Sequence, residues 1–176
     1  MIVNKTLLLS IAFFIALLSG EQKTKETENQ EILLGYFKKE DLMQKPHSAW
    51  FNAGYKHYKP KAKALKNIQE NIHDYEIKLI MGTWCADSQY EVPKFYKLLD
   101  ITGFDQDKLQ AYAVDEYKVA GDKVADSYDV ELVPTIIFYK DGKEVNRFVE
   151  YAVDNLEEDI AKIVSGKKYE HSYFGF

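Results

Sequence analysis

The feature that most constrains the fold lies between residues 76 and 99. Residues 76–81 form a short apolar run of strand length, and residues 82–88, with the sequence Gly-Thr-Trp-Cys-Ala-Asp-Ser, follow it directly. Apolar and aromatic residues then recur at helical spacing, at Tyr90, Val92, Phe95, Tyr96, Leu98 and Leu99. This pattern predicts a strand that passes through a tight loop into a helix, with a cysteine at the start of the helix.

The segments that follow predict alternating strands and helices. Strands are predicted at residues 109–114, 135–139 and 145–149, and helices at residues 122–128 and 156–164. The turn sequence Lys-Asp-Gly-Lys at residues 140–143 joins the last two strands into a hairpin. The predicted order is therefore βαβαββα, which indicates an α/β protein.

The first thirty residues indicate export. Residues 1–20 contain Lys5, an apolar run at residues 7–18 and a final Ser-Gly, which is the layout of a secretory signal peptide. The apolar run is shorter than the roughly 20 residues of a membrane-spanning helix, so a membrane-anchored form with an uncleaved signal is the less favoured interpretation. Residues 21–30 are polar and charged, as in a flexible tether. We therefore expect an exported, periplasmic or otherwise extracytoplasmic protein.

The rest of the chain has the size of one domain with additions at both ends. We expect a mainly helical extension at residues 31–75, the main domain at 76–166 and a tail at 167–176. In the extension, Pro60 is expected in the first turn of a helix that runs to about Ile72. Four aromatic residues before it are expected to pack the extension against the main sheet or, as a less favoured interpretation, to stack on a ligand: Trp50, Phe51, Tyr55 and Tyr58.

Composition and charge exclude several functional classes. Hydrophobic residues make up 46% of the chain and charged residues 29%, which favours a packed core over a disordered chain. The net charge is -5 and no block is rich in Lys or Arg, so we expect no nucleic-acid partner. The histidines, at positions 47, 57, 73 and 171, fit no metal-ligand spacing with the cysteine, and no glycine-rich phosphate loop is present. No metal and no cofactor are expected.

Cys85 is the only cysteine of the chain. Structural cysteines of exported proteins come in pairs, so a lone thiol is inert, engaged with another molecule, or reactive. The start of a helix presents unpaired N–H groups and a positive dipole end, which favour a thiolate. Asp87 opposes a thiolate if its carboxylate approaches the sulfur without intervening solvent. Cys85 is therefore a candidate nucleophile, with an inert packing cysteine as the alternative.

Two separated motifs and the order of elements resemble the thioredoxin superfamily. The motifs are Trp84-Cys85-x-x at the first strand-to-helix junction and Val133-Pro134-Thr135 before the hairpin. The resemblance covers residues 76–164 and is closest to exported bacterial thioredoxin-like proteins with a Gly-Thr-Trp-Cys-x-Asp-Ser motif behind a helical extension. It implies a thioredoxin-like fold, in which helices flank a central mixed sheet.

The resemblance also assigns roles to site residues. Cys85 would be the redox nucleophile and Trp84 a surface aromatic beside the sulfur. Pro134 matches a proline that is cis in thioredoxin-like folds, and the backbone of Val133 would pair with an extended substrate segment. These two residues and Trp84 are therefore the candidate substrate-binding residues.

Two residues depart from the thioredoxin pattern. Ser88 replaces the second cysteine that resolves a mixed disulfide in the dithiol enzymes. Its hydroxyl is expected to hydrogen-bond the Cys85 sulfur or to cap the following helix. Leu79 stands where thioredoxin has a buried carboxylate that assists proton transfer. Asp87, Glu91 or water are therefore the candidates for proton transfer.

The resemblance implies thiol–disulfide exchange through Cys85, by mixed-disulfide formation or isomerisation. The expected partners are protein or small-molecule thiols and disulfides. Isomerisation suits a single thiol better than net reduction does, because the substrate supplies the resolving sulfur. The alternative is a redox-inactive module of peptide-binding or chaperone-like function, and a peroxidase is disfavoured because no Thr-x-x-Cys arrangement surrounds Cys85.

Overall fold

The computed structural model describes residues 31–120 and 124–175. The predicted signal peptide and tether lie outside the described residues, as do the first two residues of the helix predicted at 122–128. Among the described residues, no helix combines the length and the apolar character needed to cross a membrane.

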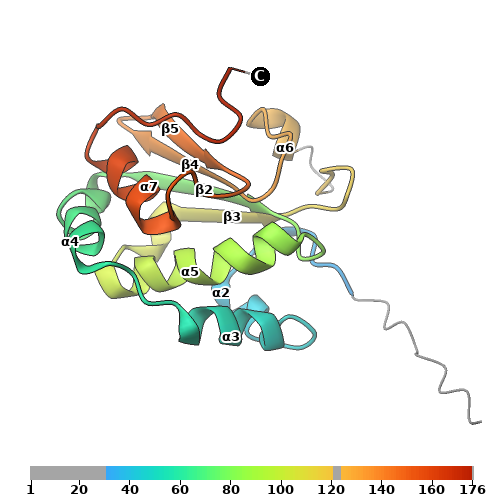
Figure 1. Ribbon diagram of the computed structural model, residues 1–176. Helices are drawn as coiled ribbons and strands as arrows, with labels where there is room; N and C mark the ends of the chain where they lie inside the picture. Colours follow the sequence, from blue (N-terminus) through green and yellow to red (C-terminus); the bar gives the residue numbers. More distant parts are fainter. Residues whose placement is uncertain (1–30, 121–123, 176) are drawn as a thin grey trace, which may run out of the picture.

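A five-stranded mixed sheet forms the centre of the molecule (Figure 1). Its strand order is β1-β3-β2-β4-β5, with β2 parallel to β3 and every other neighbouring pair antiparallel. The strands are β1 (Gly35–Phe37), β2 (Glu76–Met81), β3 (Leu109–Ala113), β4 (Thr135–Lys140) and β5 (Lys143–Val149). The fold class expected from the sequence, a mixed sheet flanked by helices, is confirmed.

Helices cover both faces of this sheet. The α-helices are α2 (Lys39–Leu42), α3 (Ser48–His57), α4 (Ala62–Asn71), α5 (Ala86–Thr102), α6 (Val124–Ser127) and α7 (Leu156–Val164), and the 3-10 turns are η1 (Ile72–Asp74) and η2 (Gln106–Lys108). Residues of α4, α5 and α7 share one hydrophobic cluster with the sheet, and Ala125 of α6 belongs to a second cluster with Ile80 and Ile137. The sheet is therefore buried on both sides.

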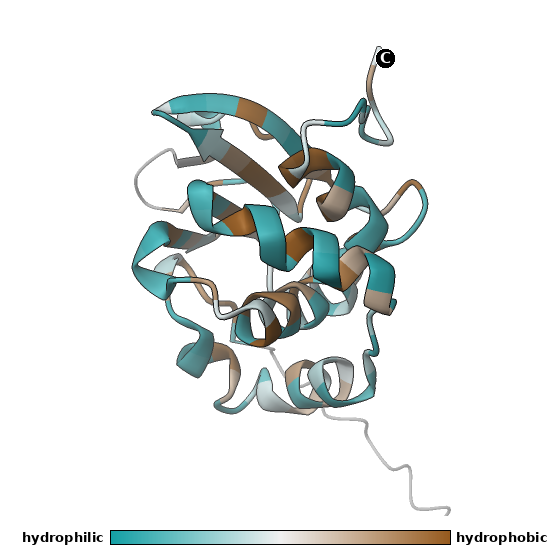
Figure 2. Ribbon diagram, turned by 90° about the vertical axis from the view of Figure 1, so that its left-hand side faces the viewer, coloured by the Kyte–Doolittle hydropathy of each residue, from teal (hydrophilic) through white to brown (hydrophobic). Residues whose placement is uncertain are grey.

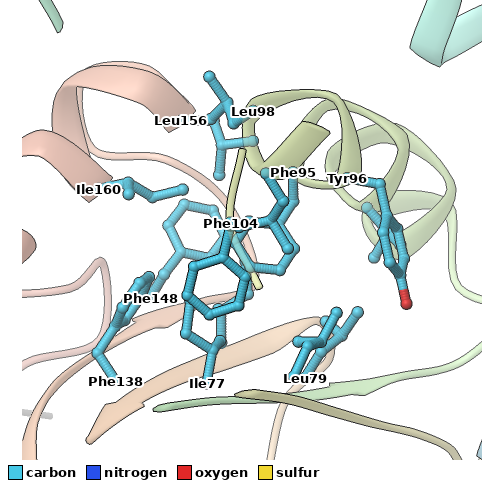
Figure 3. Packing of buried hydrophobic residues seen from close by; sticks show 14 of the residues in the cluster. Ile77, Leu79, Phe95, Tyr96, Leu98, Phe104, Phe138, Phe148, Leu156 and Ile160 are labelled. Atoms are coloured by element: carbon cyan, nitrogen blue, oxygen red, sulfur yellow. The ribbon is translucent and has the colours of Figure 1, made fainter. Parts of the chain in front are cut away.

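The larger cluster is built by alternate residues of the strands. Ile77, Leu79, Phe138 and Phe148 rise from the sheet and meet Phe95 and Leu98 of α5 and Leu156 and Ile160 of α7 (Figure 3). In Figure 2 the helices carry alternating hydrophilic and hydrophobic stretches, as expected for helices with one buried face. Leu79 is thus a core residue. Its apolar side chain is fully buried at the position where the resemblance to thioredoxin would place a carboxylate.

The N-terminal extension is mainly helical as expected, with one short strand in addition, and the start of its last helix needs correction. The segment contains one strand, β1, whose Gly35–Phe37 backbone pairs antiparallel with the edge of β3. A strand of three residues is too short to show an alternating pattern in the sequence. Helix α4 begins at Ala62, two residues after Pro60, and Lys61 is its N-cap with extended backbone angles.

The aromatic strip packs into the core cluster that strands of the sheet also form, and it makes direct contacts with α5 and α7. The ring centroids of Phe51 and Tyr96 lie 5.9 Å apart at an angle of 67°. Tyr55 donates a hydrogen bond of 2.6 Å to Asp100 of α5, and Tyr58 donates one of 2.6 Å to Glu157 of α7. Helix α3 therefore forms an outer layer over α5 (Figure 1).

The C-terminal tail packs along β5. Tyr169 is buried, and its carbonyl accepts a hydrogen bond of 3.1 Å from the Asn146 side chain. The Ser172 hydroxyl donates to the Val149 carbonyl over 2.9 Å. The tail therefore lies against the second half of β5, at Asn146 and Val149.

Phe51 tests the docking of the extension on α5. Phe51 is 2% exposed, so Phe51→Ala leaves a cavity beside Tyr96. We expect the free energy of unfolding to fall by roughly 3–5 kcal/mol, as measured by urea denaturation. Phe174→Ala is the control, because Phe174 is 60% exposed and the same change there should cost less than about 0.5 kcal/mol. Equal effects of the two substitutions would contradict this packing.

Candidate active site around Cys85

The Cys85 thiol lies where two distant segments meet. Cys85 is the N-cap of α5, with φ -82° and ψ 125°, and its N–H donates to the Gly82 carbonyl over 3.0 Å. Its half-buried Sγ donates a hydrogen bond of 3.1 Å to the backbone carbonyl of Val133. The structure therefore brings together two of the residues that the sequence selected, although they are 48 positions apart.

The Val133–Pro134 peptide bond is cis. Val133 is buried with Ile80 and Ala125 in the smaller hydrophobic cluster. The Pro134 carbonyl accepts a hydrogen bond of 2.7 Å from the N–H of Glu150, the first residue after β5. This segment is therefore fixed between the cysteine loop and the loop that leads to α7.

Trp84 is anchored to the end of β3. Its indole Nε1 donates to the Val114 carbonyl over 2.8 Å, and the ring is half-buried against the smaller cluster. A Cβ atom at Gly82 would lie 2.6 Å from two indole atoms, so a side chain there would displace the ring. Gly82 is therefore required for the position of Trp84.

Ser88 is fully buried in the first turn of α5. Its Oγ accepts a hydrogen bond of 3.2 Å from the N–H of Gly82. Of the two roles left open for Ser88, capping is not found, because Cys85 occupies the N-cap, and a bond to the Cys85 sulfur remains a prediction. The hydroxyl holds the loop before the cysteine closed, and this backbone partner could not be read from the sequence.

Thr83 is a site residue that sequence reasoning missed. Its buried Oγ1 accepts a hydrogen bond of 3.1 Å from the N–H of Leu33, in the segment before β1. Its carbonyl accepts one of 2.7 Å from the Gln89 side chain. These bonds tie the N-terminal extension to the cysteine loop, and no spacing rule connects positions 33 and 83.

Asp87 and Glu91, the candidates for proton transfer, lie on successive turns of α5. Asp87 is half-exposed, whereas Glu91 is 3% exposed and forms an ion pair of 3.1 Å with Lys94. Burial raises the pKa of the Glu91 carboxyl because desolvation disfavours its charged form, and this outweighs the opposing effect of Lys94. The negative charge of Asp87 raises this pKa further. The proton-transfer role of both residues remains a prediction.

The described residues contain no group of three or more His, Cys, Asp or Glu side chains that could hold a metal ion.

The thioredoxin family model matches residues 60–162. This match covers more than half of the chain, so the chain belongs to the thioredoxin family. The chain thus shares the family's fold, and the particular chemistry depends on its own site residues.

Individual thioredoxins match over parts of the chain. A chloroplastic thioredoxin Y from Oryza sativa subsp. japonica is 36% identical over 67 residues, which are 38% of this chain and 37% of that protein. The chain therefore matches little more than a third of the length of this relative. A thioredoxin from Gallus gallus is 30% identical over 111 residues, which cover 53% of this chain and 94% of that protein.

Two solved structures align with part of the chain. The thioredoxin of Fasciola hepatica is 26% identical, with a TM-score of 0.39 over 58% of this chain and 89% of that chain. A protein of unknown function from Pseudomonas aeruginosa is 13% identical, with a TM-score of 0.49 over 68% of this chain and 81% of that chain.

Ser88→Ala tests the bond that closes the cysteine loop. Because the variant leaves the buried Gly82 N–H without its acceptor, we expect a loss of about 1–3 kcal/mol in the free energy of unfolding. Ser165→Ala is the matched control. Its hydroxyl donates to the Ala161 carbonyl, which keeps a bond of 3.2 Å from the Ser165 N–H, so the loss there should stay below about 0.5 kcal/mol. A loss for Ser88→Ala no larger than the loss for Ser165→Ala would contradict a stabilising role of the Ser88 hydroxyl.

The environment of Glu91 predicts a pH dependence of stability. A pKa raised by folding means that the folded state binds the proton more tightly, so stability declines as pH rises from the ordinary value of 4.5 through the folded pKa. Glu91→Gln lacks this decline. The difference in unfolding free energy, variant minus wild type, should therefore increase with pH across this window.

The measurement is a series of urea denaturation curves between pH 4 and pH 8. Glu70→Gln, on the exposed face of α4, controls for the loss of one negative charge. A difference that decreases with pH would mean that the Lys94 ion pair dominates over burial.

Proposed function

We propose that this protein carries out thiol–disulfide exchange outside the cytoplasm with Cys85 as its single nucleophile. The observation that carries the proposal is the contact of 3.1 Å between Cys85 Sγ and the carbonyl of Val133, beside the cis Pro134. It places the one thiol of the chain beside the Val133–Pro134 backbone, where an extended segment of a partner is proposed to bind. The extracytoplasmic location rests on the signal-like pattern of residues 1–20.

The proposed reaction begins with the Cys85 thiolate. It attacks one sulfur of a substrate disulfide, so that a bond forms between Cys85 and that sulfur while the substrate S–S bond breaks. The second substrate sulfur leaves as a thiolate and takes up a proton. A substrate thiol then attacks the mixed disulfide, forms a new substrate disulfide and releases the Cys85 thiolate. Over the cycle no electrons are gained or lost, so the reaction is isomerisation.

Ser88 favours isomerisation over net reduction. A reductase of the dithiol type releases its product when a second cysteine attacks the mixed disulfide. The hydroxyl at position 88 cannot do this, and it is already bonded to the Gly82 N–H. The resolving sulfur must therefore come from the substrate or from a small external thiol.

A second candidate is a redox-inactive module that binds peptides. The apolar side chain of Leu79 favours it, because no carboxylate there accepts a proton in the core beneath α5. In this case the surface at Trp84 and Val133-Pro134 binds an extended segment without covalent chemistry.

Mixed-disulfide trapping distinguishes the two candidates. We incubate the chain from residue 21 onward with oxidised glutathione and measure adducts by mass spectrometry under non-reducing conditions, with Cys85→Ser as the blank. The first candidate predicts one glutathione adduct on the wild type that persists until a thiol is added. Ser88→Cys should resolve the same adduct within the chain and form a disulfide between positions 85 and 88.

The absence of a glutathione adduct would contradict the first candidate. If the wild type forms no adduct while a free cysteine peptide reacts under the same conditions, the exchange function is excluded and the binding module remains. Where the wild type does form the adduct, scrambled ribonuclease provides the functional assay, because an isomerase restores its activity and a binding module does not.

A further inference from the structure

A hollow of about 470 Å³ lies at the edge of the sheet where β1 ends and α2 begins. Strand β1 pairs with β3 only at Ala111–Ala113, so Leu109 and Gln110 have no neighbouring strand on this edge among the described residues. Both of these residues line the hollow. A free strand edge presents backbone N–H and C=O groups, so this wall offers hydrogen-bond donors and acceptors together.

Tyr96 of α5 lines the inner side of the hollow and is 1% exposed. Its ring packs in the larger hydrophobic cluster, with its centroid 5.9 Å from that of Phe51. Figure 3 shows its hydroxyl pointing toward the sheet and away from the phenylalanine side chains of the cluster. This buried hydroxyl has no hydrogen-bond partner in the part of the chain that the structure describes. Because an unpaired buried polar group destabilises a fold, the hydroxyl calls for a partner from outside the chain.

The Tyr96 hydroxyl acts as a hydrogen-bond donor. Burial raises its pKa because desolvation disfavours the phenolate, and the negative charge of Glu40 raises it further. The proton therefore stays on the oxygen and requires an acceptor. Asp41 and Asp100 add negative charge around the hydroxyl, which disfavours an anionic acceptor. An ammonium or amidinium group offers no lone pair, so a neutral carbonyl oxygen is the acceptor that suits this position.

The outer side of the hollow has apolar surface and a side chain that can move. Tyr36 is 57% exposed and Phe37 is buried, and both line the hollow. Glu40 also lines it, and its exposed carboxylate forms no ion pair in the described residues. Its side chain is therefore free to move aside when a ligand enters.

We propose that this hollow binds a small neutral molecule that carries a carboxamide group on an aromatic body. The amide oxygen accepts the hydrogen bond of Tyr96, and the amide N–H donates to a carbonyl group of the β3 edge, as an added strand does. Phe37 and Tyr36 contact the aromatic body. The volume of the hollow lies within the range of small-molecule sites.

The hollow is separate from the Cys85 site, and its lining includes none of the candidate residues of that site. It reaches Leu109, the first residue of β3, whereas Trp84 bonds to Val114, beyond the last residue of that strand. The proposal is therefore independent of the thiol chemistry, and Cys85→Ser should bind the same molecule as the wild type does.

The test uses three probes of one shape: benzamide is neutral, benzoate is an anion and benzamidine is a cation. Each is titrated into the isotope-labelled protein, and backbone amide shifts are followed by NMR. We expect benzamide to bind with a dissociation constant of roughly 1 mM, with the largest shifts at Phe37 and Gln110. Benzoate and benzamidine should bind about fivefold more weakly or less, because neither offers a neutral acceptor to the Tyr96 hydroxyl.

Tyr96→Phe removes the hydroxyl and keeps the ring. We expect its affinity for benzamide to fall about fivefold or more, while its urea midpoint stays equal or rises, because an unpaired buried group is removed. Tyr75→Phe is the matched control. Its buried hydroxyl donates to the Val164 carbonyl over 3.0 Å, so this variant should have a lower urea midpoint and wild-type affinity for benzamide.

Several results would overturn the proposal. These are the absence of benzamide binding, tighter binding of benzoate or benzamidine than of benzamide, and equal affinity of Tyr96→Phe and the wild type for benzamide. A lower urea midpoint of Tyr96→Phe would also overturn it, because the hydroxyl would then be satisfied without a ligand. None of these results bears on the exchange function, which the adducts of Cys85 test separately.

Discussion

The contact between Cys85 Sγ and the Val133 carbonyl is the interaction on which the site depends, because it joins the start of α5 to the segment before β4. Each side of this contact is anchored separately. Trp84 is bonded to the end of β3, and the Pro134 carbonyl is bonded to the first residue after β5. Four strands of the sheet therefore contribute to the position of one sulfur atom, so the geometry of the site follows from strand order.

Much of this arrangement can be predicted from local sequence patterns. The strand at Glu76–Met81 and the helix at Leu156–Val164 have the predicted bounds, because an apolar run and a helical period are local signals. The cysteine and the Val133-Pro134 pair can also be selected from the sequence, since each belongs to a recognisable motif at a predicted strand boundary. That Cys85 and Val133-Pro134 lie close together in space can be predicted once the order of the elements is assigned to a fold.

Other features depend on contacts that no local pattern encodes. The strand β1 exists because three residues pair with the edge of β3, and the aromatic residues of α3 find their partner on α5. The roles of Ser88 and Thr83 are likewise defined by backbone N–H groups of Gly82 and Leu33. A side chain's type shows that it can accept a hydrogen bond, but only the folded chain determines which donor it meets.

The buried Ser88 hydroxyl has an evolutionary consequence. Serine and cysteine differ by one atom, so a single substitution at position 88 would supply a second sulfur one helical turn after Cys85. Sulfur is a weak acceptor, however, and the Gly82 N–H would lose much of its hydrogen bond. A lineage that exchanges a monothiol site for a dithiol site must therefore also strengthen the loop before Cys85, which couples the redox capacity of this fold to its stability.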